Sequence, residues 1–177
     1  QRFAMEPAVA IGGIVKDFKG QPLADAEVHI DMTVYDYDLV DCVAKTDARG
    51  QWRFDSAPSR TTRMKLRLVH ADHATTVYEL KNRPADKALK DLTAGLTINR
   101  GAPVSGGVAD DSGRPIAGAT VHVGGAAGRR APTKCEADGT FTLRNIGLGN
   151  ARIVARAPGH TPRQREIVVR IPCEPAD

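Results

Sequence analysis

The residues best suited to chemistry lie together in one segment, DMTVYDYDLVDC at residues 31–42. This segment combines four aspartates with two tyrosines. Aromatic ring faces stack on sugar rings, and carboxylates accept hydrogen bonds from sugar hydroxyl groups. One hypothesis is therefore a carbohydrate-binding surface formed by Tyr35, Asp36, Tyr37 and Asp38.

A metal ion is the second hypothesis for these aspartates. Calcium needs about six to eight converging oxygen ligands, and the segment lacks the glycine that would let a loop wrap around an ion. His70 and His73 could chelate a metal ion at a strand end, but the sequence places no third ligand beside them. We therefore predict no metal ion and no cofactor, and a solvated loop or edge strand over residues 31–42.

An internal repeat indicates which elements carry these residues. Residues 11–30 align without a gap with residues 104–123, and nine positions are identical. Residues 45–54 align with residues 134–143 at a smaller offset, so the loops differ in length while the order of segments is kept. The repeat predicts two related folded units, divided near residue 100.

The repeat also bears on catalysis. His29 and His122 occupy one position of the two copies, which favours a role in the fold over a role in a single active site. The sequence contains no G-x-S-x-G motif and no suitable pair of cysteine and histidine for nucleophilic catalysis. We therefore predict that the protein is not an enzyme.

Period-two alternation dominates the sequence and predicts β-strands. In residues 26–34 apolar side chains at even positions alternate with polar ones, as in a strand with one buried face. Four segments share an acid-x-x-glycine pattern, in which the acidic side chain can bond backbone amides and glycine closes the turn. Only residues 84–92 favour a short helix. These patterns predict antiparallel β-sandwiches with turns at residues 17–20, 47–50, 110–113 and 136–139.

Composition narrows the classes of partner. The net charge is +4, from 25 basic and 21 acidic residues, and residues 128–130 form the one basic cluster. Nucleic-acid-binding proteins concentrate positive charge and interleave aromatic residues, so we predict no nucleic-acid partner. No apolar run reaches the roughly 18–20 residues that span a bilayer, so we predict no membrane span in this segment. Because the chain opens at Gln1, we expect it to be part of a longer protein.

The cysteines Cys42, Cys135 and Cys173 do not predict a disulfide framework, because their number is odd. Free, half-buried thiols are the favoured interpretation. A single bridge between Cys135 and Cys173 within the second unit remains the alternative.

The pattern GGIVKDFKGQPLADAEV…KTDARGQWRF, repeated as GGVADDSGRPIAGATV…KCEADGTFTL, resembles the carboxypeptidase regulatory-like domain family. That family consists of seven-stranded, prealbumin-like (transthyretin-like) sandwiches, and the resemblance covers nearly the whole chain in two copies. It implies an all-β fold of two tandem Ig-like or prealbumin-like antiparallel Greek-key β-sandwiches, residues 1–100 and 101–177. By the same resemblance the core-facing side chains include Trp52, Phe54, Phe141 and Leu143.

The resemblance also implies a function. Such domains are accessory modules beside many unrelated domains, and tandem copies are typical of large bacterial envelope or secreted proteins. We therefore predict a non-catalytic accessory or structural module, extracellular or in the cell envelope, that spaces and docks neighbouring domains of the same polypeptide or another protein. The alternative is a carbohydrate-binding module that binds a glycan through the loop of Tyr35 and Tyr37. Intradiol ring-cleaving dioxygenases start similarly, but their iron-binding H-x-H pair is missing here.

Overall fold

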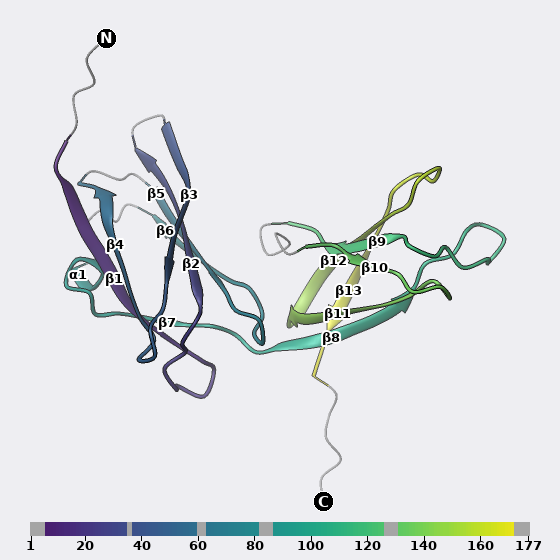
Figure 1. Ribbon diagram of the computed structural model, residues 1–177, viewed down its shortest axis with the longest axis horizontal. Coiled ribbons are helices and arrows are strands. Elements are labelled where there is room, and N and C mark those ends of the chain that lie inside the picture. Colours follow the sequence, from purple (N-terminus) through teal and green to yellow (C-terminus); the bar gives the residue numbers. More distant parts are fainter. Residues whose placement is uncertain (1–5, 35–36, 60–62, 82–86, 126–130, 172–177) are drawn as a thin grey trace, which may run out of the picture. The chain divides into compact units, whose positions relative to one another are not determined.

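The computed structural model describes residues 6–34, 37–59, 63–81, 87–125 and 131–171 (Figure 1). Two compact units divide the chain, and each is described by itself. Unit 1 comprises Gln1–Ala71 and Thr75–Asn99, and unit 2 comprises Asp72–Ala74 and Arg100–Asp177. Within the described residues, no helix is long and apolar enough to cross a membrane.

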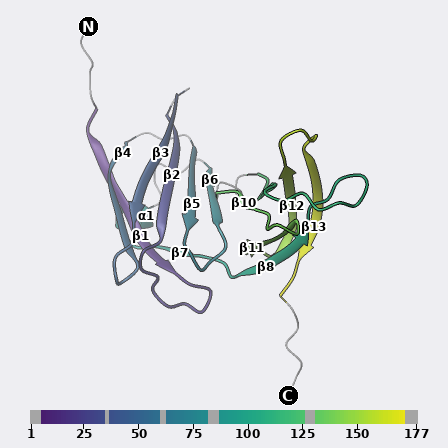
Figure 2. The same ribbon diagram turned by 45° about the vertical axis from the view of Figure 1, so that its right-hand side comes forward.

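Unit 1 is built from two β-sheets and one short helix (Figure 1, Figure 2). The first sheet has the strand order β4-β1-β7 and contains β1 (Ala8–Lys16), β4 (Gln51–Pro58) and β7 (Ala94–Thr97). The second has the order β3-β2-β5-β6 and contains β2 (Glu27–Val34), β3 (Tyr37–Lys45), β5 (Arg63–Val69) and β6 (Thr76–Lys81). The helix α1 (Lys87–Lys90) lies within the segment for which a short helix is predicted.

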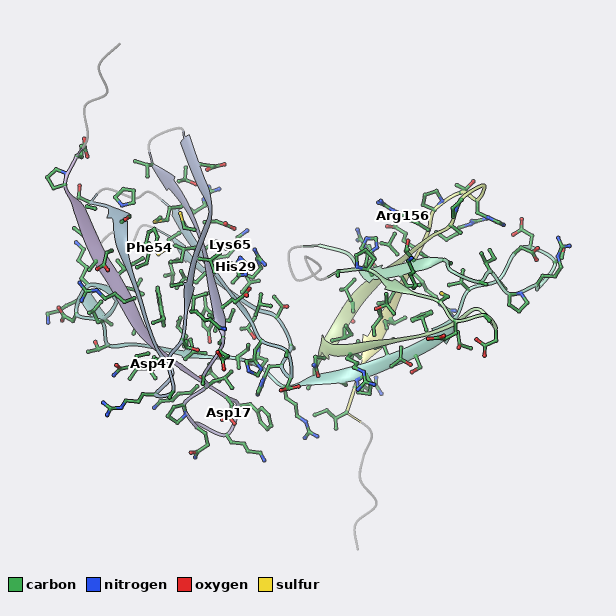
Figure 3. The ribbon with its side chains drawn as sticks, viewed as in Figure 1. Asp17, His29, Asp47, Phe54, Lys65 and Arg156 are labelled. Carbon is green, nitrogen blue, oxygen red and sulfur yellow. The ribbon has the colours of Figure 1, made fainter. Side chains whose placement is uncertain are left out.

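The core of unit 1 consists of the inward faces of these strands. Val28 and Ile30 on β2 are fully buried, while His29 between them is half-buried. Each fully buried aliphatic side chain of this size stabilises the fold by about 1.5–3 kcal/mol. Trp52 is 3% exposed, and Phe54 packs partly buried against the same cluster (Figure 3). The predicted alternation and the predicted core positions in unit 1 are confirmed.

Strand β7 departs from the predicted antiparallel pattern. It pairs in parallel with β1, from Gly13 opposite Ala94 to Lys16 opposite Thr97. Just beyond the strand, the Ile98 amide donates a hydrogen bond of 2.8 Å to the carbonyl of Lys16. A parallel neighbour is possible here because the chain between β1 and β7 runs through β2 to β6 and α1, which is far longer than a hairpin turn.

Side chains of β6 hold β7 from its other edge. The Tyr78 hydroxyl donates to the carbonyl of Thr97 at 2.8 Å and accepts from the Thr97 amide at 2.9 Å. The Asn99 amide donates to Oγ1 of Thr76 at 2.9 Å. Strand β7 therefore closes the side of the sandwich that lies between β1 and β6.

Unit 2 repeats this plan with six described strands (Figure 2). A two-stranded sheet contains β8 (Gly101–Gly107) and β11 (Thr140–Gly147). A four-stranded sheet of order β10-β9-β12-β13 contains β9 (Thr120–Val123), β10 (Thr133–Lys134), β12 (Gly149–Arg156) and β13 (Arg163–Val169). Leu143 is 5% exposed and Phe141 packs against the same cluster, as predicted.

The strand registers show that the two units are copies. In unit 1 Gly13 lies opposite Trp52, and in unit 2 Gly106 lies opposite Phe141. The sequence repeat pairs the same two glycines. The repeated segments therefore occupy equivalent places in two β-sandwiches, and the predicted fold class is confirmed.

The acid-x-x-glycine segments form turns by the predicted mechanism in three of the four places. Oδ1 of Asp17 accepts hydrogen bonds of 2.8 Å from the amides of Lys19 and Gln21 (Figure 3). Asp47 and Asp110 accept equivalent pairs of amide bonds. The fourth turn differs, because there Asp138, rather than the first acidic residue, accepts from the Thr140 amide at 2.9 Å.

The glycine that ends the second turn of each unit is held against the first strand. The Val15 amide donates to the Gly50 carbonyl at 2.8 Å, and the Val108 amide donates to the Gly139 carbonyl at 2.9 Å. Gly50 has a φ of 71°, and a Cβ added there would lie 2.4 Å from the Val15 carbonyl oxygen. Both the conformation and the lack of space therefore require glycine.

We expect Gly50→Ala to destabilise unit 1 by roughly 2–4 kcal/mol, because the added methyl group meets backbone that cannot move aside. The matched control is Gly20→Ala. Gly20 also has a positive φ, of 84°, but a Cβ there would meet nothing within 4 Å, so a loss of about 1–2 kcal/mol is expected. Urea unfolding followed by fluorescence of Trp52, the single tryptophan, measures both. Equal losses would contradict the steric explanation.

Candidate functional site

Of the four residues of the predicted carbohydrate surface, the structure describes the side chain of Asp38. Tyr35 and Asp36 lie outside the described residues, and for Tyr37 the structure describes the backbone at the start of β3. Asp38 is exposed and its Oδ1 accepts a hydrogen bond of 2.8 Å from the Thr33 hydroxyl across the β2–β3 pair. The glycan hypothesis therefore stays a prediction.

Polar side chains on the outer face of the same sheet pair with one another (Figure 3). Nε2 of His29 lies 3.0 Å from Oε2 of Glu27, and Nζ of Lys65 lies 3.3 Å from Oε1 of Glu79. Exposed pairs of this kind contribute little to stability. Across the described parts of the chain, no three His, Cys, Asp or Glu side chains converge to hold a metal ion.

Two of the cysteines are free thiols. Cys42 is half-buried, and Cys135 is buried. Burial, together with the nearby carboxylates of Asp138 and Glu136, raises the pKa of the Cys135 thiol. The alternative bridge involves Cys173, which lies outside the described residues.

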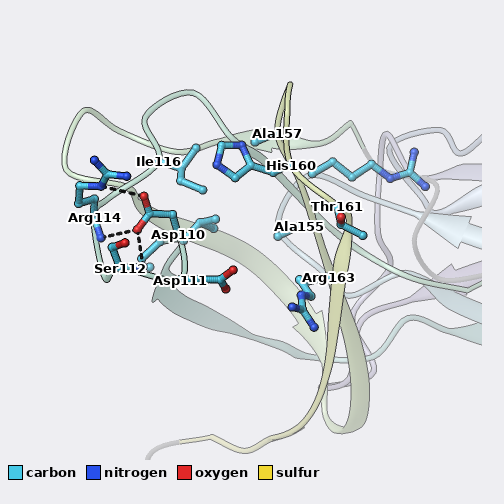
Figure 4. A pocket seen from close by; sticks show the side chains of 14 residues that line it. Asp110, Asp111, Ser112, Arg114, Ile116, Ala155, Ala157, His160, Thr161 and Arg163 are labelled. Carbon is cyan, nitrogen blue, oxygen red and sulfur yellow. Dashed lines mark hydrogen bonds and ion pairs between the residues drawn. The ribbon is translucent and has the colours of Figure 1, made fainter.

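A pocket in unit 2 is the first part of the candidate site (Figure 4). It has a volume of about 530 Å³ and lies between the turn after β8, the end of β12 and the start of β13. Asp110 and Arg114 lie at one side of it, and Arg163 lies across from them (Figure 4). His160 lines the pocket from the loop between β12 and β13.

The Asp110 carboxylate in this pocket is already engaged. Oδ1 accepts from the amides of Ser112 and Arg114 at 2.9 Å, and Oδ2 accepts from Nε of Arg114 at 2.9 Å. The hydrogen bond from the Arg114 amide is the main cause that lowers the pKa of Asp110 below its ordinary value of 3.8. The bond from Nε of Arg114, the bond from the Ser112 amide and the charge of His160 lower this pKa further. The carboxylate therefore orders the turn.

A groove along β8 and β13 continues this pocket and is the second part of the candidate site. It has a volume of about 660 Å³, and its lining includes the apolar side chains of Val104, Val108, Val121, Phe141, Ile153 and Ile167. Both hollows are lined by Val108 and Arg163, so they form one continuous surface. The groove opens between the edge strands of the two sheets, because β8 and β13 each have one paired neighbour among the described strands.

Arginines mark the rim of this groove, which we call the β8–β13 groove. Ile167 and Val169 face the core on β13, so by alternation Arg163 and Arg165 lie on the same side of the strand. Both arginines are exposed and line the groove. Sequence reasoning missed this site. Its signal was present: the core-facing positions of β13 are arginines in the first half of the strand and apolar residues in the second half.

The comparison with protein families matches part of the chain. The model of the carboxypeptidase regulatory-like domain matches residues 103–172, from β8 to beyond β13. Residues 103–172 are thus similar to the carboxypeptidase regulatory-like domain family. The matched residues include the lining of both the Asp110 pocket and the β8–β13 groove. Among curated proteins, no sequence matches the chain.

Solved structures similar to the chain are distant in sequence. The Streptococcal ancillary pilin is 15% identical with a TM-score of 0.43, and the match covers 91% of this chain and 59% of the pilin. The Bacillus anthracis TIE protein is 12% identical with a TM-score of 0.34 and coverage of 93% and 32%. The shaft pilin SpaA from Lactobacillus rhamnosus GG is 10% identical with a TM-score of 0.35 and coverage of 92% and 93%. The chain thus spans less than two thirds of the first two proteins.

We expect the stabilising effect of the Asp110 charge to depend on pH. Because the folded-state pKa is lowered, the contribution is complete above the ordinary value and is lost as the pH falls through the folded value. Asp110→Asn keeps an acceptor oxygen but removes the charge. The variant should melt below the wild type above about pH 5, and the difference should shrink as the pH falls below the ordinary pKa of 3.8.

Scanning calorimetry measures this difference in the melting temperature of unit 2. A parallel fluorescence melt identifies the transition of unit 2, because Trp52 lies in unit 1 and its fluorescence changes only when unit 1 unfolds. The control is Asp111→Asn, since Asp111 is exposed and accepts no hydrogen bond from the described residues. A pH-independent difference for Asp110→Asn would contradict the assignment.

Proposed function

We propose that the chain is a non-catalytic structural module of a larger bacterial envelope or secreted protein, which carries tension between neighbouring domains and docks them or a partner protein. The proposal treats residues 1–100 and residues 101–177 as two carboxypeptidase regulatory-like β-sandwiches, the first by its repeat of the second. The extracellular or envelope location follows the family resemblance.

The pairing of β1 with β7 is the observation that supports this function. The chain enters unit 1 at the start of β1 and leaves it at the end of β7, and these strands are parallel. Tension along the chain therefore pulls the two strands in opposite directions along their length. The hydrogen bonds between them are loaded together in shear rather than one after another, which gives the unit its highest resistance to extension.

Three acidic side chains are committed to turns of the fold. The carboxylates of Asp17, Asp47 and Asp110 each accept two backbone amide bonds within their own turn. A carboxylate whose Oδ1 accepts two amide bonds is fixed in its turn and stabilises that turn. This use of the acids supports a structural role.

Single-molecule pulling of the chain through its two ends tests the proposal. We expect two unfolding steps, with length gains of roughly 300 Å for unit 1 and roughly 230 Å for unit 2, from about 3.3–3.6 Å per residue. The longer step should need the higher force, because among the described strands the parallel pair belongs to unit 1. A lower force for unit 1 would refute the tension-carrying role.

A change of pulling direction is the control. Handles at Glu6→Cys and Ser59→Cys, with the native cysteines replaced by alanine, load β1 against β4 from one end, since Ala8 lies opposite Pro58 in that antiparallel pair. These bonds break in sequence, so unit 1 should unfold at a clearly lower force than with handles at the two ends of the chain. Direction-independent forces would exclude the shear explanation.

A further inference from the structure

Strand β7 is held from two sides that belong to different sheets of unit 1. On one side it pairs with β1 in the first sheet. On the other side lies β6, the last strand of the second sheet, and side chains of β6 bind the backbone of the β7 segment. The chain leaves unit 1 at the end of β7 (Figure 1). Tension from that end of the chain therefore acts first on this doubly held segment.

The backbone of the β7 segment alternates between its two sides. The Ile98 amide donates to the Lys16 carbonyl on β1 at 2.8 Å. The amides of Thr97 and Asn99, one residue before and one after, donate to β6 instead. Successive residues of a strand in the middle of a sheet bond to opposite neighbours in this way. The segment is thus held as a central strand is, although its second neighbour contributes side chains.

Tyr78 satisfies both polar backbone groups of one residue. Its hydroxyl donates to the Thr97 carbonyl at 2.8 Å and accepts from the Thr97 amide at 2.9 Å. A phenolic hydroxyl can replace a neighbouring backbone here because it offers one donor and also accepts. The ring of Tyr78 packs against the core of unit 1, so the hydroxyl has little freedom to move away from β7.

Thr76 supplies the second attachment. It is 8% exposed, and its Oγ1 accepts from the Asn99 amide at 2.9 Å. Thr76 and Tyr78 are two residues apart on β6 and therefore lie on the same face of that strand. We call these two side chains the β6 latch. Strand β6 is itself paired with β5 over six residue pairs, from Arg63 opposite Lys81 to Leu68 opposite Thr76.

We infer that the β6 latch sets the force at which unit 1 unfolds, because its hydroxyl groups transmit tension from β7 to the second sheet. The inference deepens the tension-carrying part of the proposed function and rests on it. Without the latch, β7 is attached through β1 to the first sheet alone. With the latch, β7 cannot slide along β1 until its bonds to Tyr78 and Thr76 break as well, so both sheets share the load.

The test pulls the complete chain of residues 1–177 through its two ends at constant force. The double variant Tyr78→Phe with Thr76→Val nearly keeps the size of both side chains and removes both hydroxyl groups. Loss of one hydrogen bond changes an equilibrium or a rate by roughly two- to tenfold. Because three bonds are lost, unit 1 should unfold at least about tenfold faster at a given force. Thr76→Ser with Tyr78 intact keeps both hydroxyl groups and should unfold close to the wild-type rate.

The matched control removes a hydroxyl bridge that lies away from the β1–β7 pair. Oγ1 of Thr46 accepts from the Ala26 amide at 2.8 Å and donates to the Leu23 carbonyl at 2.7 Å, and Thr46 is 5% exposed. Thr46→Val should lower the urea midpoint of unit 1, followed by Trp52 fluorescence. It should keep the wild-type unfolding rate under end-to-end force, because its bonds are still intact when β7 detaches. A rate increase as large as that of the double variant would overturn the inference.

The direction of pulling separates the latch from a general loss of stability. With handles at Glu6→Cys and Ser59→Cys, which load β1 against β4, the double variant and the protein with an intact latch should unfold at equal rates. Equal acceleration in both directions overturns the inference. A double variant that unfolds at the wild-type rate from the chain ends, while unit 1 stays stronger than unit 2, refutes the latch and leaves the tension-carrying role standing. A wild-type unit 1 that is weaker than unit 2 refutes the proposed function itself.

Discussion

In both units three segments of the chain meet at the backbone of one valine. The Val15 amide donates to Gly50, and the Val15 carbonyl accepts from Leu23 at 3.0 Å. Val108 makes the same two bonds, to Gly139 and from Ile116. These bonds connect the first strand to the turn before the fourth strand and to the start of the second. The two sheets are thereby placed face to face, and the core between them follows from this constraint.

The shared frame explains why two similar units offer different surfaces. Once the first strand is held in this way, the edge that does not pair with the fourth strand lies along one side of the sandwich. In unit 1 that edge is used by β7, which Tyr78 on β6 also holds. In unit 2 the same side is the β8–β13 groove, with arginines in place of the residues that bind β7. One copy thus has this side closed by β7, whereas in the other copy no described strand lies beside β8 there.

The acidic residues of the acid-x-x-glycine turns serve the fold itself. Each turn uses one carboxylate to satisfy amides that a tight turn leaves unpaired. Because these groups are partly or fully accessible to water, their net contribution is modest and the sheets provide most of the stability. The charges on the outer faces pair locally or face water. This division leaves the two arginines of the β8–β13 groove beside apolar side chains, with no ion pair to any described residue.

The sequence by itself determined the repeat, the turns and the inward faces, because each depends on local rules. Alternation with a period of two decides which side chains are buried, and glycine at positive φ decides where turns close. The core positions of Trp52 and Leu143 were implied by the family resemblance.

Only the tertiary structure decided how the strands pair across long distances. The parallel contact between β1 and β7 joins residues far apart in the chain, and no local pattern encodes it. The candidate site depends on this same pairing. A reader of the sequence sees Arg163 and Arg165 as alternating strand residues and looks for chemistry at residues 31–42. The open edge beside those arginines appears only when two edge strands, β8 and β13, are brought together around a shared core.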